Sequence, residues 1–272
     1  MWLPQNVTKK AGGGAGVATP NKPNVTLVRS KDILTRPVRD ANGVRLLGDY
    51  VMKDGAKMFT VYMTPSKQEQ SYTSDGDEDM IGINQKYVGI FPGDTLEVNE
   101  LVQNLLGEDV EIIAGNCVDG FTRAFGTECS PMKLKPEYKS DNSGRMHTLT
   151  FEQYTKTGFV PGFYYGNQTF AEPTSTDESL DLTEANGTQY KLDEFDTTAS
   201  IDTATIDQPH GTFITLIGSG GDDPATLASG AGTAATVILK DDTDWTALKD
   251  ATITFMVFDA DSTIYLIEQS RS

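Results

Sequence analysis

Short apolar runs bounded by turn residues recur along most of this chain, and a single segment has the spacing of an amphipathic helix. The runs 58–63, 110–114 and 252–258 are rich in Val, Ile, Phe and Thr, which favour strands. Asn-Gly and Asp-Gly pairs, such as those at 42–43 and 119–120, are typical of hairpin turns. The pattern predicts a mainly β fold.

The exception is the segment 94–106, DTLEVNELVQNLL. Asp94 or Thr95 is placed to cap a helix, and Gly107 is placed to end it. Apolar side chains recur at helical spacing and form one stripe, made of Val98, Leu101, Val102 and Leu105. We therefore expect one helix that packs against a sheet.

Composition divides the chain into four parts. Residues 1–24 contain a Gly-rich run and two prolines, which predicts a flexible N-terminal arm. Residues 25–166 form a β domain, 167–188 read as an acidic linker, and 189–272 as a smaller C-terminal β-sandwich domain. Within the first domain, the polar and acidic stretch 66–82 is expected to be a long loop between two strands.

Charge is distributed unevenly in this chain of net charge −17. Residues 1–65 carry a net +6, residues 66–166 carry −8 and residues 167–272 carry −15. The acidic total argues against a protein that reads nucleic-acid sequence, which needs a basic surface. A basic front and an acidic back instead favour association between molecules.

The residues that carry chemistry form no recognisable catalytic or metal-binding pattern. Asp75, Asp77 and Asp79 alternate like the start of a calcium loop, but Met80 and Lys86 stand where such a loop needs Gly and Glu. Eleven residues separate Cys117 from Cys129, which does not fit a zinc knuckle and leaves their pairing open. We expect no enzyme activity, no cofactor and no metal.

Neither a membrane span nor a signal peptide is expected, since no apolar run reaches the required length. Aromatic residues gather at Phe159, Phe163, Tyr164 and Tyr165 around Pro161. Such a group serves in a packed strand end, in a contact between subunits or in a platform for sugars, and packing or contact is favoured.

The order of these parts resembles the major tail tube proteins of tailed bacteriophages. The resemblance covers residues 25–166, and its elements are a hairpin with a long acidic loop (58–90), the helix 94–106, the segment 125–131 (FGTECSP) and the segment 144–153 (GRMHTLTFEQ). It implies a β-sandwich or barrel with one flanking amphipathic helix, and a long loop that reaches the next ring. The C-terminal domain would be an addition to that fold.

The resemblance implies a structural subunit of a virion, assembled in the host cytoplasm. Its partners would be copies of itself, other virion proteins and genome DNA that passes without sequence-specific contact. The residues expected at contacts between subunits are Arg36, Arg39, Arg45, Gln70, Tyr72, Asp75, Asp77, Asp79, Phe163 and Tyr164. Two alternatives are a capsid decoration or head protein and a glycan-binding β-sandwich that uses Trp245 and the 159–165 aromatics as its platform.

Overall fold

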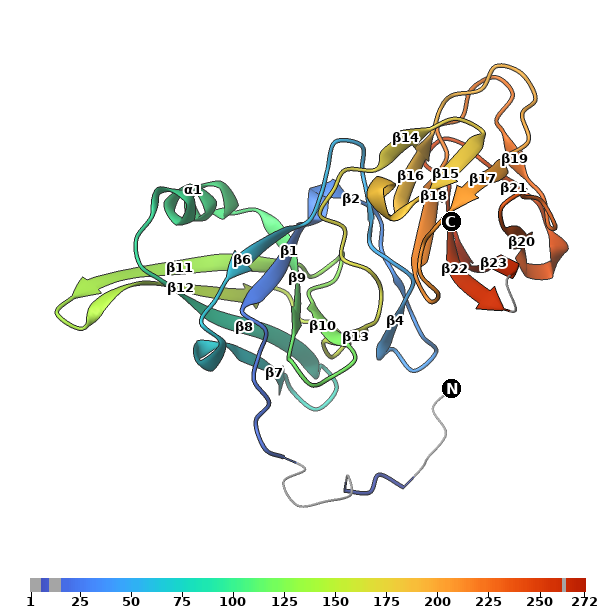
Figure 1. The fold of residues 1–272 in the computed structure, drawn as a ribbon. Helices are drawn as coiled ribbons and strands as arrows, with labels where there is room; N and C mark the ends of the chain where they lie inside the picture. Colours follow the sequence, from blue (N-terminus) through green and yellow to red (C-terminus); the bar gives the residue numbers. More distant parts are fainter. Residues whose placement is uncertain (1–5, 10–15, 261–262) are drawn as a thin grey trace. The chain divides into compact units, whose positions relative to one another are not determined.

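The computed structural model describes residues 6–9, 16–260 and 263–272, and this part of the chain is mainly β with one α-helix (Figure 1). The chain divides into two units. The first unit comprises residues 1–31, 39–46 and 59–165, and the second comprises 32–38, 47–58 and 166–272. The predicted boundaries at 25–166 and 189–272 therefore need correction, because two N-terminal segments fold with the C-terminal part.

The elements of the first unit are β1 (Asn24–Arg29), β4 (Arg45–Leu47), β6 (Phe59–Tyr62), the 3-10 helix η2 (Pro65–Lys67), β7 (Glu69–Asp75), β8 (Gly82–Pro92), α1 (Leu96–Leu105), β9 (Asp109–Gly115), β10 (Thr122–Phe125), β11 (Met132–Asp141), β12 (Gly144–Gln153) and β13 (Gly162–Tyr164). The 3-10 helix η1 (Ser30–Asp32) and β3 (Val38–Arg39) span the sequence boundaries of the units, and Leu47 at the end of β4 already belongs to the second unit.

The elements of the second unit are β2 (Ile33–Thr35), β5 (Val51–Met52), β14 (Thr174–Thr176), β15 (Ser179–Leu182), η3 (Glu184–Asn186), β16 (Gln189–Leu192), β17 (Asp202–Ile206), β18 (Phe213–Ile217), β19 (Thr226–Leu227), β20 (Thr236–Ile238), η4 (Lys240–Asp242), β21 (Trp245–Thr246), β22 (Thr252–Ala260) and β23 (Thr263–Arg271).

One branched sheet builds the first unit. Along its main path the strand order is β3-β4-β13-β10-β9-β11-β12-β8-β7, and β1 joins β9 to β6. Val110 pairs with both β1 and β11, and Ile112 pairs with both β1 and β10, so β10 and β11 share one edge of β9. The sheet thus divides at β9 into two branches, which meet where Tyr87 of β8 packs edge-on against Phe125 of β10 at 5.7 Å.

The helix and the core of this unit follow the predicted pattern. Thr95 caps α1 by accepting a hydrogen bond from the Val98 backbone N–H, and Val98 and Leu105 are buried. Leu106, which follows the last residue of the helix, is 59% exposed. The core contains large apolar side chains from both branches, among them Leu27, Tyr87, Ile112, Phe125, Met132, Leu149 and Phe151.

The stretch 66–82 is not a long loop. Seven of its residues form β7, which pairs with β8 from Glu69↔Val88 to Asp75↔Gly82. Only 76–81 remain as the connection of the hairpin. Gly76 has a φ of +136°, and a Cβ there would lie 2.2 Å from the Met80 carbonyl oxygen, so this tip requires glycine.

The stretch 167–188 is not a linker either. It holds β14, β15 and η3, and it belongs to the second unit. Leu180 and Leu182 alternate with exposed residues in β15 and are fully buried in the core. The acidic side chains of 167–188 made the segment resemble a linker, but these two buried leucines anchor it to the core.

The structure describes residues 6–9 and 16–24 of the predicted flexible arm 1–24. Residues 1–5 and 10–15 lie outside the described residues. At its end the chain already pairs with the first unit: Lys22 N–H donates to the Gly115 carbonyl at 2.9 Å, and the Pro20 carbonyl accepts from Cys117 N–H at 2.9 Å. Asn21 therefore forms an isolated bridge with Asn116 before β1 begins at Asn24.

A six-stranded sheet in the order β14-β16-β18-β22-β23-β20 forms the frame of the second unit, and two-stranded pairs β15–β17, β19–β21 and β2–β5 accompany it. The Gln189 side chain ties the N-terminal segment to this frame. It accepts from Met52 N–H at 3.0 Å and donates to the Tyr50 carbonyl at 2.7 Å.

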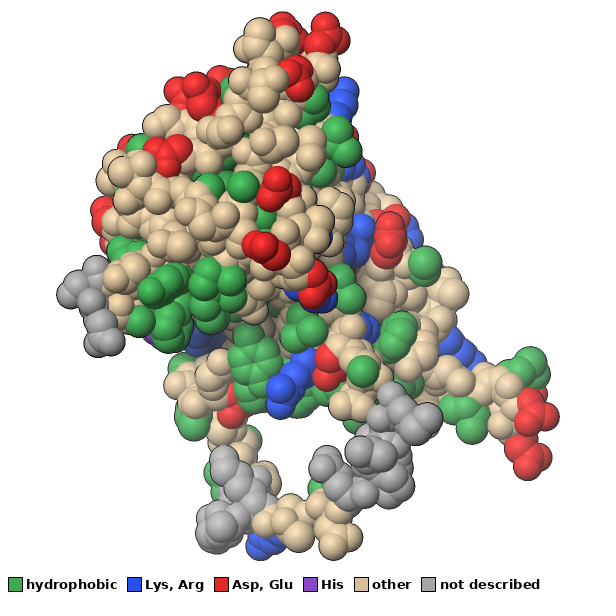
Figure 2. All heavy atoms as spheres, turned by 90° about the vertical axis from the view of Figure 1, so that its right-hand side faces the viewer, with side chains coloured by type: hydrophobic (Ala, Val, Ile, Leu, Met, Phe, Trp, Pro, Cys, Tyr) green, Lys and Arg blue, Asp and Glu red, His purple; other side chains and the backbone are tan. Residues whose placement is uncertain are grey.

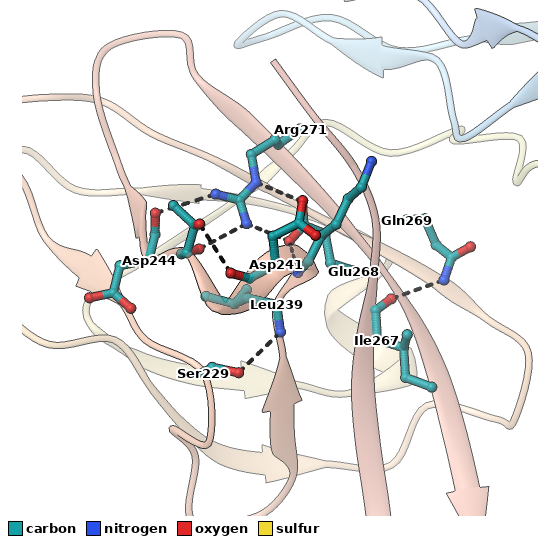
Figure 3. A network of polar contacts seen from close by, with 10 residues as sticks. Ser229, Leu239, Asp241, Asp244, Ile267, Glu268, Gln269 and Arg271 are labelled. Atoms are coloured by element: carbon teal, nitrogen blue, oxygen red, sulfur yellow. Dashed lines mark hydrogen bonds and ion pairs between the residues drawn. The ribbon is translucent and has the colours of Figure 1, made fainter.

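Polar contacts fasten the last strand to the turn at 239–244 (Figure 3). Arg271 donates from Nε to Glu268 Oε1 at 2.6 Å, and it also donates to the carbonyl oxygens of Thr243 and Asp244. Glu268, whose side chain is 2% exposed, accepts from Lys240 N–H at 2.7 Å. Burial alone would raise the pKa of Glu268, but the hydrogen bonds from Arg271 and Lys240 outweigh it and lower the pKa.

Candidate interaction site

Arginine and phenylalanine side chains form a row across three adjacent strands of the first unit. Phe163 of β13 is the register partner of Arg45 in β4 and of Arg123 in β10. Register partners project from the same face of a sheet, so the pairing places these three side chains in line. The guanidinium centre of Arg123 lies 4.0 Å from the ring centroid of Phe163 and 5.8 Å from that of Phe121.

Three aromatic rings, one of them from this row, pack on one another. Phe121 lies 4.5 Å from Phe163 and 6.0 Å from Tyr165, measured between ring centroids. The sequence favoured a packed strand end or a contact between subunits for the 159–165 aromatics, and Phe163 and Tyr165 do pack on Phe121. Cation–π attraction and ring packing together hold Arg123 in place.

A pocket of about 230 Å³ opens beside this group. We call it the Arg123 pocket, and it is lined by Gln70, Ser71, Tyr72, Arg123, Phe125 and Pro161. Its two sides come from β7 and from β10 with the segment before β13, so it lies where the two branches of the sheet face each other. The structure thus brings the predicted contact residues Gln70 and Tyr72 to the same place as Phe163, with Arg123 as the link.

Arg123 is half-buried, and burial lowers the pKa of its guanidinium while the nearby Tyr72 and Asp119 act in the opposite direction. Its hydrogen bond from Nη1 to the Pro161 carbonyl is long, at 3.4 Å. Within the described part of the chain, no carboxylate lies within 4.0 Å of this guanidinium. Sequence reasoning missed Arg123, because a lone arginine in a strand carries no motif.

β7 contributes the second feature of the site, an open strand edge. It stands at the end of the sheet and pairs with β8 alone among the described strands. Unpaired N–H and C=O groups along such an edge are ready to bond another strand. The strand is seven residues long and largely exposed, which makes its edge accessible.

The tip of the β7–β8 hairpin joins acidic and apolar side chains. Asp75 pairs with Lys156 at 2.8 Å, and the hydrogen bond from Lys156 lowers the pKa of Asp75. Asp77 and Asp79 are exposed, as expected for a solvated acidic tip. Met80 and Ile81, which were not among the predicted contact residues, are 69% and 65% exposed.

The three predicted arginines have different surroundings. Arg39 donates to the carbonyl oxygens of Gly43 at 2.8 Å and Val160 at 3.3 Å, and its guanidinium lies 4.7 Å from the Phe159 ring centroid. It braces the first unit and is not a free contact residue. Arg45 is exposed on the same unit, whereas Arg36 belongs to the second unit.

Two predicted aromatic contacts are buried. Tyr164 is 1% exposed, so it supports the sheet and does not reach a contact surface. Trp245 is 4% exposed in the core of the second unit and therefore cannot serve as an exposed platform for sugars.

A patch of apolar side chains covers the outer face of the second unit's sheet. The register pairs Met256 with Ile267 and Phe258 with Tyr265, and Ile238 is the neighbour of Ile267 on β20. Phe258 and Ile238 are 37% and 41% exposed, and Figure 2 shows hydrophobic side chains gathered on this side of the molecule. This patch is a second candidate for contact.

The sequence left the pairing of Cys117 and Cys129 open, and in the structure both thiols are free and exposed. Among the described residues, no group of three or more His, Cys, Asp or Glu side chains has the geometry to hold a metal ion. No helix within the described ranges has both the length and the apolar character needed to cross a membrane.

Comparison with models of protein families, with curated proteins and with solved structures found no match to this chain.

Proposed function

We propose that this chain is a structural subunit of a bacteriophage virion, and specifically a tail tube protein whose copies stack in rings around a channel for DNA. The observation that carries the proposal is the open edge of β7 together with the exposed hairpin tip. Both occur on a β unit with a single flanking helix, the arrangement expected of that family.

The chemistry of the hairpin suits contact between copies. A long accessible edge accepts a further strand through backbone hydrogen bonds. Met80 and Ile81 supply apolar area at the tip, and Asp77 and Asp79 supply charge that limits unspecific association. A ring of identical subunits uses heterologous contacts of this kind, in which one surface meets a different surface of the next copy.

Charge supports passage of DNA without retention. The second unit carries 7 Lys and Arg against 22 Asp and Glu, a net −15, and the first carries 15 against 17, a net −2. An acidic assembly repels the phosphate backbone, so DNA would move through it without sticking.

Sedimentation velocity of the purified full-length chain over a wide range of concentration tests the proposal. We expect a discrete large species, or a series of growing species, beside the 29.5 kDa monomer. A monomer at every concentration would contradict self-assembly. A species that forms only on addition of phage capsids would favour the capsid decoration role instead.

A further inference from the structure

We propose that the Arg123 pocket binds a carboxylate group, with the Arg123 guanidinium as the main ligand. The inference goes beyond the proposed function, because it assigns a ligand class to a pocket and holds for a free acid as well as for a side chain of a second copy. It depends on the donors in the pocket, on its size and on how Arg123 is held.

Most of the hydrogen-bonding capacity of Arg123 is unused. A guanidinium has five N–H donors. Within the described residues, the hydrogen bond to the Pro161 carbonyl at 3.4 Å is its one protein contact of this kind. A half-buried cation with unused donors is a strong site for an anion, because water solvates it less well than it would a free side chain.

The aromatic contacts fix this cation without consuming its donors. Cation–π attraction acts on the face of a guanidinium, whereas its N–H bonds lie in its plane. With the guanidinium centre 4.0 Å from the Phe163 centroid, the planar fork is held beside the pocket and costs less entropy on binding. Carboxylates match this fork with two parallel hydrogen bonds.

The other lining groups select a small, singly charged ligand group. Gln70 and Tyr72 offer an amide and a hydroxyl as neutral donors, and Phe125 and Pro161 offer apolar walls. A volume of about 230 Å³ is less than that of pockets for drug-sized molecules and suits one side chain or a short acid. Larger polyanions are disfavoured by the net charge of −17.

The test is a titration of the full-length protein with succinate. Binding is measured by isothermal titration calorimetry and by the change in the NMR signal of the Arg123 Nε–H group. We expect saturable binding, weakened at least about tenfold in Arg123→Gln. Arg123→Lys should give an intermediate loss, because lysine keeps the charge without the fork. Arg145→Gln, at an exposed arginine of β12, is the matched control and should bind as the wild type does.

Tyr72→Phe provides a second variant in case Arg123→Gln does not fold. It removes one hydroxyl from an exposed edge strand, and we expect it to weaken succinate binding about threefold. Absence of binding to the wild type, equal binding by Arg123→Gln, or equally tight binding of inorganic phosphate would overturn the proposal.

A second experiment, which measures self-association, distinguishes the two possible sources of the carboxylate. If it belongs to a side chain of a second copy, succinate should compete with self-association and Arg123→Gln should weaken that association. If it belongs to a free acid, Arg123→Gln should lose succinate binding while association is unchanged. Because the titration measures succinate binding to the pocket directly, failure of the chain to assemble would leave the result on the pocket intact.

Discussion

Arg39 and Arg45 stand near each other on short strands of the first unit, yet they have different roles. Arg39 donates to two backbone carbonyl groups and lies over Phe159, whereas Arg45 is exposed. Both arginines follow a valine in the sequence, and only the fold shows that Arg39 braces the unit while Arg45 is a surface charge.

Reversal of these two charges should therefore have different effects on stability. We expect Arg39→Glu to lower the free energy of unfolding by about 2 kcal/mol, because it removes charged donors from two carbonyl groups. Arg45→Glu should change it by less than about 0.5 kcal/mol. Chemical denaturation of both variants beside the wild type measures this, and equal losses would show that Arg39 is not a brace.

Glu268 braces the second unit as Arg39 braces the first, through its hydrogen bonds with Arg271 and the Lys240 backbone N–H. Its lowered pKa means that the unfolded chain, with a value near 4.5, binds a proton that the folded chain does not. Its contribution to stability is therefore complete above pH 4.5 and is lost as the pH falls through the lower, folded pKa.

Glu268→Gln should lower the stability of the second unit by about 2 kcal/mol at neutral pH, because Arg271 loses a buried charged partner. The difference from the wild type should shrink in acid. Thermal melts at pH 7 and at pH 3 measure both effects, with Glu194→Gln, an exposed glutamate, as control. A difference that grows in acid would contradict the assigned pKa direction.

At the scale of elements, the β7–β8 hairpin carries the proposed contact. Replacing residues 76–81 with Asn-Gly keeps the pair Asp75↔Gly82 and supplies a favoured two-residue turn. We expect this variant to fold with an unchanged melting temperature and to lose self-association.

The matched control alters the other long hairpin. Asp141 pairs with Gly144 in β11–β12, so Ser143→Gly changes that two-residue tip while the register is kept. It should assemble as the wild type does. If the 76–81 replacement also assembles normally, the contact lies elsewhere, and the apolar patch on β22 and β23 becomes the next candidate.

The sequence predicted the strands whose apolar residues alternate or run together, such as β9 and β22, and it placed α1 within two residues. It missed β7, because a strand exposed along most of its length has no apolar signal and is defined by backbone pairing with β8. It also missed Arg123, whose significance arises from Phe163 forty residues away. The assignment of 32–38 and 47–58 to the second unit is a long-range property that no local pattern encodes.

At the scale of the whole molecule, the charge asymmetry survives the corrected boundaries. The segments 32–38 and 47–58 carry three basic and three acidic side chains, so the net +6 of residues 1–65 lies in the first unit. A neighbour's second unit, at −15, offers a complementary surface. Contact between the basic residues of one copy and the acidic second unit of its neighbour would be electrostatic and exposed to solvent.

Association should therefore slow as salt is added, since exposed charges are screened over about 10 Å at 0.1 M salt. We expect Arg45→Glu to slow assembly more than Lys249→Glu, which makes the same change of charge in the acidic unit. Light scattering during assembly measures both rates. Equal slowing would mean that net charge alone matters.

Negative-stain electron microscopy of the purified wild type beside the 76–81 replacement tests the central claim most directly. The proposal predicts rings or hollow tubes in the wild type and separate folded subunits in the variant. Separate subunits in both samples, under all conditions of salt and concentration, would contradict it.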